Sequence, residues 1–367
     1  MNSQGQSLLW TRRVAGLLAG TTFLLLLAGG LVTTYRVGMA VNDWPTTFGY
    51  SMLSYPLDEM LENTGVTQEH SHRLLGTLVG IMTLIVMGVS ASAGGRLART
   101  WMFVALGHEV ALVVCIVMTK AVFGPIQAVL FVGVLIALAL SYRLPAERAV
   151  RGAAIGAHLA VVFQGLLGGT RVLENSQQLA FLHGTCAQLV FVAVVILFVI
   201  SGDAWREARP VVSPDGANLP LFAWSAILAT FIQVVLGAWL RHTGGTLPLF
   251  LHIVCALFVT MAIAVLWMRL GKVFAVSPEL VALVGIRRWL IGSLILQWLL
   301  GVSALAAILI LSGGFEGPVT VVEGITATAH VGIGALLLSG TVVSLLWSRR
   351  LIMDSRGPEQ PPVPTSS

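Results

Sequence analysis

Long runs of apolar residues alternate with short polar segments from residue 14 to residue 348. A helix that crosses a bilayer needs about 20 predominantly apolar residues, and each run meets that length. The first run follows Arg12 and Arg13, but it is too long for a signal peptide and no small-residue cleavage site follows it, so we expect a retained helix. The pattern predicts an all-α polytopic membrane protein with ten transmembrane helices, at residues 14–35, 74–93, 101–119, 124–142, 152–170, 179–200, 219–240, 247–269, 288–312 and 327–348.

Lys and Arg are distributed unevenly between the two ends of these spans. With an even number of spans and the N-terminus in the cytoplasm, sixteen of the 21 Lys and Arg residues fall on the cytoplasmic side. Because cytoplasmic loops carry an excess of Lys and Arg, we predict a multi-pass protein of the cell (inner) membrane with both termini in the cytoplasm. The five remaining basic residues fall on the outer side and are Arg36, Arg73, Lys120, Arg171 and Arg241.

Composition agrees with a lipid environment and limits the classes of function. Charged residues make up 10% of the chain, whereas soluble domains carry about 25%. No basic run is interleaved with aromatic residues, so we expect no nucleic-acid partner. The cysteines, Cys115, Cys186 and Cys255, each lie in an apolar run at spacings that fit neither a disulfide framework nor a zinc site, and we interpret them as buried thiols.

A repeated motif, Gln-x-x-Leu-Gly, lies near the outer end of three of the predicted spans, and a histidine opens the span that follows each copy. The first two copies have the same 19-residue offset from glutamine to histidine, and the third has a longer outer loop with an offset of 33 residues. A degenerate fourth copy has Gly29-Gly30 in the first span and His72 near the second. The three full copies pair Gln164 with His183, Gln233 with His252, and Gln297 with His330.

These copies predict four two-helix units that form two pseudo-symmetric four-helix bundles, both facing the same way across the membrane. We expect an N-terminal half at 1–200, interrupted by an inserted helical hairpin at about 101–142, and a C-terminal half at 201–350. The Pro- and Ser-rich tail within 351–367 is expected to be disordered.

Four histidines at equivalent depths predict a shared role, because polar groups inside a bilayer are costly and usually functional. Imidazole is a common axial ligand of heme iron, so one histidine from each of two helices would hold one heme, and each half would hold one. A hydrogen bond between helices is the alternative for any one of them. The outer arginines Arg36, Arg73, Arg171 and Arg241 are candidates to bind heme propionates, with interfacial snorkelling as the alternative. The repeat glycines allow close approach of a macrocycle or simply of a neighbouring helix.

The segment Glu69-His70-Ser71-His72-Arg73 resembles the Glu-x-x-His-Arg signature of heme A synthases. Gly29-Gly30-Leu31 with Asp43-Trp44-Pro45 resembles the first helix and outer loop of that family, and the later repeats and Ala329-His330 are similar to its later helices. The resemblance covers about residues 14–93 and 152–348. It implies an oxidoreductase that converts heme O to heme A by oxidising a heme methyl group to a formyl group.

The resemblance also implies a role for each site residue. His252 and His330 would hold a resident heme b, and His72 and His183 would bind the substrate heme, with Glu69 as an acid–base residue beside it. An acid at a helix start is the alternative for Glu69. The implied partners are heme O, membrane lipid, a heme O synthase and assembly factors of the terminal (cytochrome) oxidase, while a homo-oligomer stays open.

The chain departs from the family pattern in two places. Residues 37–71 contain no cysteine pair, and the hairpin at 101–142 has no counterpart that we recognise. His108 and Glu109 in this hairpin fit either a proton path or a mutually satisfied polar pair. We interpret His158 as structural, and His70 and His242 as surface residues or partners of the site.

Two other functions compete with the synthase. A di-heme b-type electron-transfer cytochrome would use the same four histidines but has no need of Glu69. A transporter is suggested by the internal repeats, but it would carry broken helices and polar residues near the membrane midplane, whereas the repeat residues here lie near the outer face.

Overall fold

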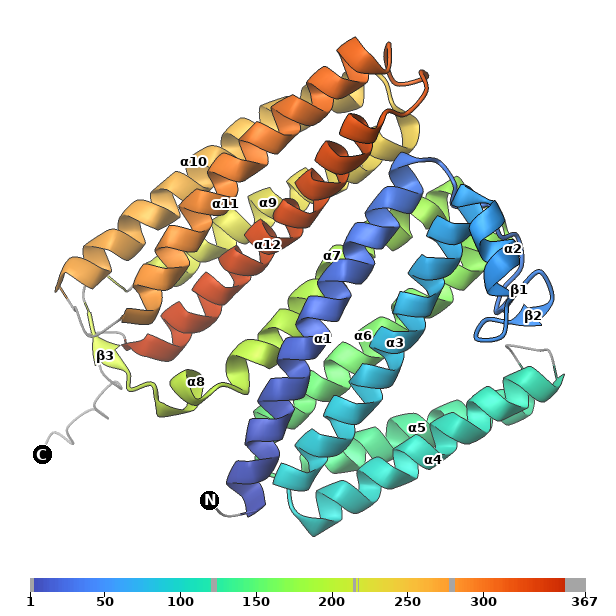
Figure 1. The fold of residues 1–367 in the computed structure, drawn as a ribbon. Helices are drawn as coiled ribbons and strands as arrows, with labels where there is room; N and C mark the ends of the chain where they lie inside the picture. The colour runs from blue at the N-terminus through green and yellow to red at the C-terminus, as the bar shows by residue number, and fades with distance from the viewer. Residues whose placement is uncertain (1–2, 120–123, 214–215, 217, 277–280, 354–367) are drawn as a thin grey trace, which may run out of the picture. The chain divides into compact units, whose positions relative to one another are not determined.

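The computed structural model describes residues 3–119, 124–213, 216, 218–276 and 281–353 (Figure 1). Ten of its helices are long and apolar enough to cross a membrane, as the apolar runs predict. Only a helix or a closed barrel can satisfy its own backbone in lipid, so each run forms a helix. The predicted disordered tail lies, from residue 354 on, outside the described residues, as does Lys120.

The chain divides into two compact units. Unit 1 comprises residues 1–32 and 36–206, and unit 2 comprises residues 33–35 and 207–367, so the last turn of the first helix belongs to unit 2.

Unit 1 is a four-helix bundle with an additional hairpin. The bundle helices are α1 (Ser3–Thr34), α3 (Thr64–Ala93), α6 (Arg148–Leu173) and α7 (Gln177–Ile200). Small and branched side chains from all four pack into one core, among them Ala15, Val86, Ala154 and Val194. Unit 1 ends within the short helix α8 (Asp203–Glu207), one residue before its last.

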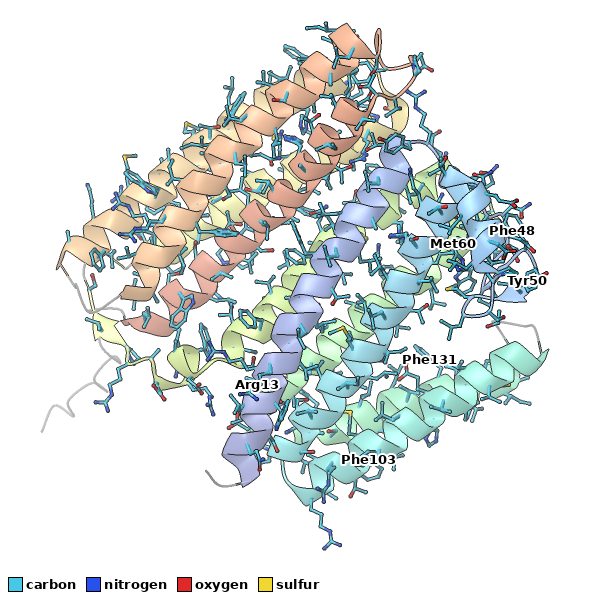
Figure 2. The ribbon with its side chains drawn as sticks, in the orientation of Figure 1. Arg13, Phe48, Tyr50, Met60, Phe103 and Phe131 are labelled. Carbon is cyan, nitrogen blue, oxygen red and sulfur yellow. The ribbon has the colours of Figure 1, made fainter. Side chains whose placement is uncertain are left out.

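The inserted hairpin consists of α4 (Arg96–Thr119) and α5 (Pro125–Arg143), which pack along one another (Figure 1). A second core joins it to the bundle, with Met87 of α3 and Ile155 of α6 against Met102 and Val134 of the hairpin. Its other face carries exposed apolar side chains such as Phe103 and Phe131 (Figure 2), as expected where a helix meets lipid tails.

Unit 2 is a second four-helix bundle, in which α9 (Leu219–Thr243), α10 (Thr246–Val276), α11 (Val281–Ala306) and α12 (Val321–Leu351) each pack against two of the others. A π-helical turn, η2 (Ala307–Leu311), extends α11. β3 (Val211–Val212) pairs in parallel with β4 (Ile352–Met353), which joins the start of the unit to its end.

The segment between α1 and α3 is folded rather than extended. It contains the hairpin strands β1 (Thr46–Thr47) and β2 (Tyr50–Ser51) and the short helix α2 (Leu57–Glu62) (Figures 1 and 2). α3 begins at Thr64, because the Asn63 side chain accepts hydrogen bonds from the backbone N–H groups of Gly65 and Val66. The span predicted from residue 74 therefore begins ten residues too late.

Candidate functional site

Two imidazole rings face one another near one end of unit 1. His72 lies in the first third of α3 and His183 in the second turn of α7. Their ring centroids are 6.4 Å apart and their planes cross at 85°. Histidines 111 residues apart in the sequence are thereby brought together, because both follow the start of a helix at the same end of the bundle.

Unit 2 repeats this arrangement with His252 of α10 and His330 of α12. The two ring centroids are 6.1 Å apart and the planes cross at 68°.

The separation within each pair fits two ligands of one metal ion. A transition metal binds imidazole nitrogen at about 2 Å, and each nitrogen lies about 1 Å from its ring centroid, so two rings across one ion are about 6 Å apart. Among the described residues no group of three or more His, Cys, Asp or Glu could hold a metal ion. A heme iron takes only its two axial ligands from protein in a bis-imidazole site, which matches what each unit offers.

A glycine of the preceding long helix touches each of the four rings. In the three full repeats it is the glycine of Gln-x-x-Leu-Gly. In the degenerate copy it is the matching glycine of α1, Gly29. Any side chain at these positions would push the imidazole away, so the glycines set where each ring stands. The pairs are Gly29 with His72, Gly168 with His183, Gly237 with His252 and Gly301 with His330, and a Cβ atom on the glycine would lie 2.7–2.9 Å from the ring Cε1 atom.

The glutamine of each full repeat holds the same ring or its backbone. The side-chain amide of Gln164 donates to the carbonyl of His183 at 2.8 Å, and that of Gln233 to the carbonyl of His252 at 3.0 Å. Both amides also lie 3.1–3.2 Å from a nitrogen of the imidazole. The sequence pattern identified these glutamines as part of a repeat but not as partners of the histidines.

The third repeat indicates which tautomer its histidine adopts. The Nδ1 atom of His330 donates to the carbonyl of Gln297 at 3.1 Å, and the Nε2 atom lies 3.2 Å from the Gln297 amide nitrogen. Since the amide is a donor, Nε2 carries the lone pair and accepts from the amide, so a metal bound at Nε2 would replace this contact. A ring whose other N–H is fixed on a backbone carbonyl is the usual arrangement of a metal-binding histidine.

His72 differs from the other three. Leu25 occupies the place of the glutamine, four residues before Gly29. The Nδ1 atom of His72 is buried and has no hydrogen-bond partner among the described residues, although the backbone of Leu25 lies nearby. This ring is therefore held by packing rather than by an amide.

Glu69 and Arg73 join α3 to the folded segment before it. Glu69 is 2% exposed, and its carboxylate accepts from the backbone N–H of Val41 and from Arg73, each at 2.9 Å. Glu69 is the sixth residue of α3, beyond the first turn, so the helix-start interpretation is wrong. Both residues also bind the backbone of Val41, about 30 positions earlier in the chain. A hydropathy pattern reads only neighbouring residues, so it missed this end of the helix.

Arg73 also binds the carbonyls of Val41, Asp43 and Thr46, at 2.7–3.1 Å. Four hydrogen bonds occupy its guanidinium, so we assign Arg73 to the segment rather than to a propionate.

Asp43 stabilises the turn between β1 and β2. Burial alone would raise the pKa of its carboxyl group, but hydrogen bonds from Thr46, Gly49 and Phe48 outweigh burial, and the pKa is lowered. This contribution to stability is fully present above the ordinary pKa of an aspartate and is lost as the pH falls through the lowered value. The turn is therefore stable at neutral pH.

The folded segment covers the end of unit 1 where the histidine pair lies. The indole of Trp44 lies against Gly169, next to the glycine that contacts His183. Arg171, two residues further along α6, donates to the carbonyl of Gly38 at 2.7 Å. His70 is buried, and its Nδ1 atom lies 3.0 Å from the Thr47 hydroxyl, so it is not a surface residue.

The chain resembles a heme A synthase from Symbiobacterium thermophilum. The two sequences are 33% identical over 108 residues, which is 28% of this chain and 35% of the relative. The match therefore spans about a third of the length of that curated relative. No family model matches the chain, and no solved structure matches it significantly.

Each unit places one arginine near a histidine of its pair and near one buried acid. In unit 1, Arg171 lies within electrostatic range of His72 and Glu69. In unit 2, Arg241 has the same relation to His330 and Glu323. Both arginine side chains are half-buried.

The sequence reasoning missed Glu323. It lies in the first turn of α12 and is 9% exposed. Its carboxylate accepts a hydrogen bond from the Ser312 hydroxyl, and its backbone N–H donates to the side-chain oxygen of Thr320, which caps the helix. An acid seven residues before a site histidine was the available signal.

The remaining sequence candidates lie elsewhere. Arg36 lies in the turn after α1 with a left-handed backbone, at φ +59°. His242 bonds to the Ala238 carbonyl at 2.8 Å. The pairing of His108 with Glu109 is wrong, because His108 bonds to the Val104 carbonyl and Glu109 contacts His158.

Proposed function

We propose that the chain is a heme A synthase, an integral membrane oxidoreductase that oxidises a methyl group of heme O to the formyl group of heme A. The observation that carries this proposal is the pair of facing imidazoles in each unit, at 6.4 and 6.1 Å between ring centroids. Two such sites suit one substrate heme and one resident heme. The likeness to a heme A synthase supports the same reaction.

The two sites have different roles in this proposal. His252 and His330 would hold a resident heme b, which supplies one-electron transfer when bound. Both of these residues have a glutamine partner, as does His183 of the other pair. His72 and His183 would hold heme O, and His72 is the ring without a glutamine. A substrate must leave after reaction, so the less restrained ligand belongs to the substrate site.

The residues around the two histidine pairs would bind the heme propionates, cover the site in unit 1 and accept protons from the substrate. Arg171 and Arg241 are the arginines best placed to bind propionates, since carboxylates pair with guanidinium groups and both arginines lie near a site histidine. The segment over unit 1 limits the access of water. Glu69 lies beside it with two hydrogen bonds on its carboxylate, which leaves acceptor capacity for a proton released during methyl oxidation.

The proposal extends to location and partners. The chain would lie in the cell membrane with both termini in the cytoplasm, which places both histidine pairs near the outer surface. Heme O reaches it from a heme O synthase, and assembly factors of the terminal oxidase receive heme A.

The heme content of the purified protein tests the proposal. The protein is isolated from cells that make heme O, and the hemes are extracted and identified by chromatography and mass. We expect heme b together with heme O or heme A. Two hemes b per chain, with neither of the others, would instead establish the electron-transfer cytochrome.

We expect Leu25→Gln to strengthen heme binding in unit 1. The new amide would reach the His72 ring as Gln164 reaches that of His183, and such partners change metal affinity by about 10–100-fold. The purified variant should retain more heme O or heme A per chain and form heme A more slowly. Leu25→Met, which has similar volume and no amide, is the control. Equal retention in both variants would show that the missing glutamine has no bearing on release.

A further inference from the structure

Three helices of unit 1 meet at a polar cluster that is separate from the histidine pair. His158 of α6 stands between Glu109 of α4 and Thr83 of α3. Its Nε2 atom lies 2.9 and 3.1 Å from the two carboxyl oxygens of Glu109, and its Nδ1 atom lies 2.9 Å from the Thr83 hydroxyl. Glu109 is the fourteenth residue of α4 and His158 the eleventh of α6, so the cluster lies about 15–20 Å from the start of each helix.

We propose that Glu109, His158 and Thr83 form a proton-binding site inside the membrane, in which the Glu109 carboxyl group and the His158 Nε2 atom share one exchangeable proton. The site lies where the inserted hairpin packs against α3 and α6. It does not depend on the proposed function.

The hydrogen bonds determine how many protons the cluster holds. The Thr83 hydroxyl donates to the carbonyl of Gly80 at 2.6 Å, which is shorter than its contact with His158. The Thr83 oxygen therefore accepts from His158 Nδ1. A carboxylate facing an unprotonated Nε2 atom at 2.9 Å would bring two acceptors together, so one proton must lie between them. It can bond to either atom without a change in net charge.

The surroundings favour the neutral form, in which Glu109 is a carboxylic acid. Residues 74–93 of α3 and 125–141 of α5 contain no Asp, Glu, Lys, Arg or His, and residues 184–200 of α7 contain only the thiol of Cys186. His108 is turned to the Val104 carbonyl. Separating charge in a dry interior costs more than keeping the pair neutral.

Arg151 is the nearest cation on the same helix as His158, two turns toward the start of α6. Its guanidinium donates to the carbonyls of Ser141, Leu144 and Ala146 at the end of the hairpin, so it does not compensate a charge on Glu109.

Two features leave room at the ends of the cluster. The Glu109 side chain is 18% exposed, whereas that of His158 is 3% exposed, so the carboxyl group is the less covered end. At the other end, Gly76 and Gly80 lie on the same face of α3 as His72 and Thr83. A Cβ atom on either glycine would meet nothing within 4 Å, so there is space beside the Thr83–Gly80 hydrogen bond. The cluster thus connects a partly open acid to a space along the inner face of α3.

Infrared spectroscopy of the full-length protein in lipid nanodiscs at neutral pH tests this site. We expect a carbonyl stretch of a protonated carboxylic acid that disappears in Glu109→Gln and shifts when the buffer is changed to D₂O. Glu62→Gln, at an exposed acid of α2, is the control and should leave this band in place. If Glu109→Gln removes no such band, the pair is permanently ionised. If the band does not respond to D₂O, the cluster is a sealed structural contact. Either result overturns the proposal.

Thr83→Val gives a second test in case Glu109→Gln fails to fold. It keeps the size of the side chain and the carboxyl group of Glu109 but removes the acceptor of His158 Nδ1. We expect the carboxylic acid band to remain and to move in frequency. A band at the wild-type frequency would show that the three residues do not act as one site.

Discussion

His252→Ala and His330→Ala are each expected to remove most of the resident heme b and the visible absorption that it gives to the purified protein. Either change leaves one imidazole where a bis-imidazole site needs two, and the remaining ring lies about 6 Å from the place of its lost partner. His72→Ala and His183→Ala should retain heme b but form no heme A. Heme b is measured per chain from the absorption of the extracted pigment.

His242→Ala is a matched control for this experiment. His242 lies on α9 near the same end of unit 2, and its Nδ1 atom contacts the Ala238 carbonyl rather than another histidine. It should retain the wild-type content of heme b. An equal loss of heme b from all four site variants would contradict the assignment of the resident heme to unit 2, while the two-site geometry would stand.

The membrane helices could be predicted from the sequence, because a long apolar run in lipid must satisfy its own backbone hydrogen bonds and does so as a helix. The start of α3 could not. Glu69, His70 and Arg73 make residues 64–73 look like a loop, but their partners are Val41 and Thr47, more than 20 positions earlier. Long-range hydrogen bonds that satisfy polar groups within a helix leave no mark on local hydropathy.

The repeat found the glutamines, glycines and histidines but not how they fit together. The 19-residue offset indicates equivalent positions on successive helices. It does not show that the glycine touches the ring or that the glutamine amide reaches the histidine backbone, since both depend on how each hairpin packs. The contact of Glu109 with His158 was also out of reach, because 49 residues separate the two and the hairpin has no copy elsewhere in the chain.

Glu69 distinguishes the synthase from a cytochrome, and the structure changes how its variant must be interpreted. Oxidising a methyl group removes electrons and releases protons, so a base beside the substrate should speed the step after binding. Glu69 also accepts hydrogen bonds from Val41 and Arg73. A glutamine amide at this position has one oxygen that can still accept, but its NH₂ group is a donor. That NH₂ group would face either the Val41 N–H or the Arg73 guanidinium, which are donors too. Glu69→Gln therefore removes a base and weakens the attachment of the covering segment at once.

We expect Glu69→Gln to retain heme b and to accumulate heme O or a partly oxidised intermediate, with heme A formation about 10²–10⁴-fold slower. Arg73→Met separates the two roles, because it breaks the same ion pair and loosens the same segment but leaves the carboxylate in place. If Glu69 acts as a base, Arg73→Met should keep much more activity than Glu69→Gln, and Glu69→Asp should recover part of it. Equal defects in Arg73→Met and Glu69→Gln would assign Glu69 to holding the segment. Wild-type rates in Glu69→Gln would remove it from the mechanism and favour the cytochrome. Rates are measured as heme A formed per chain, with heme b content as the check on folding.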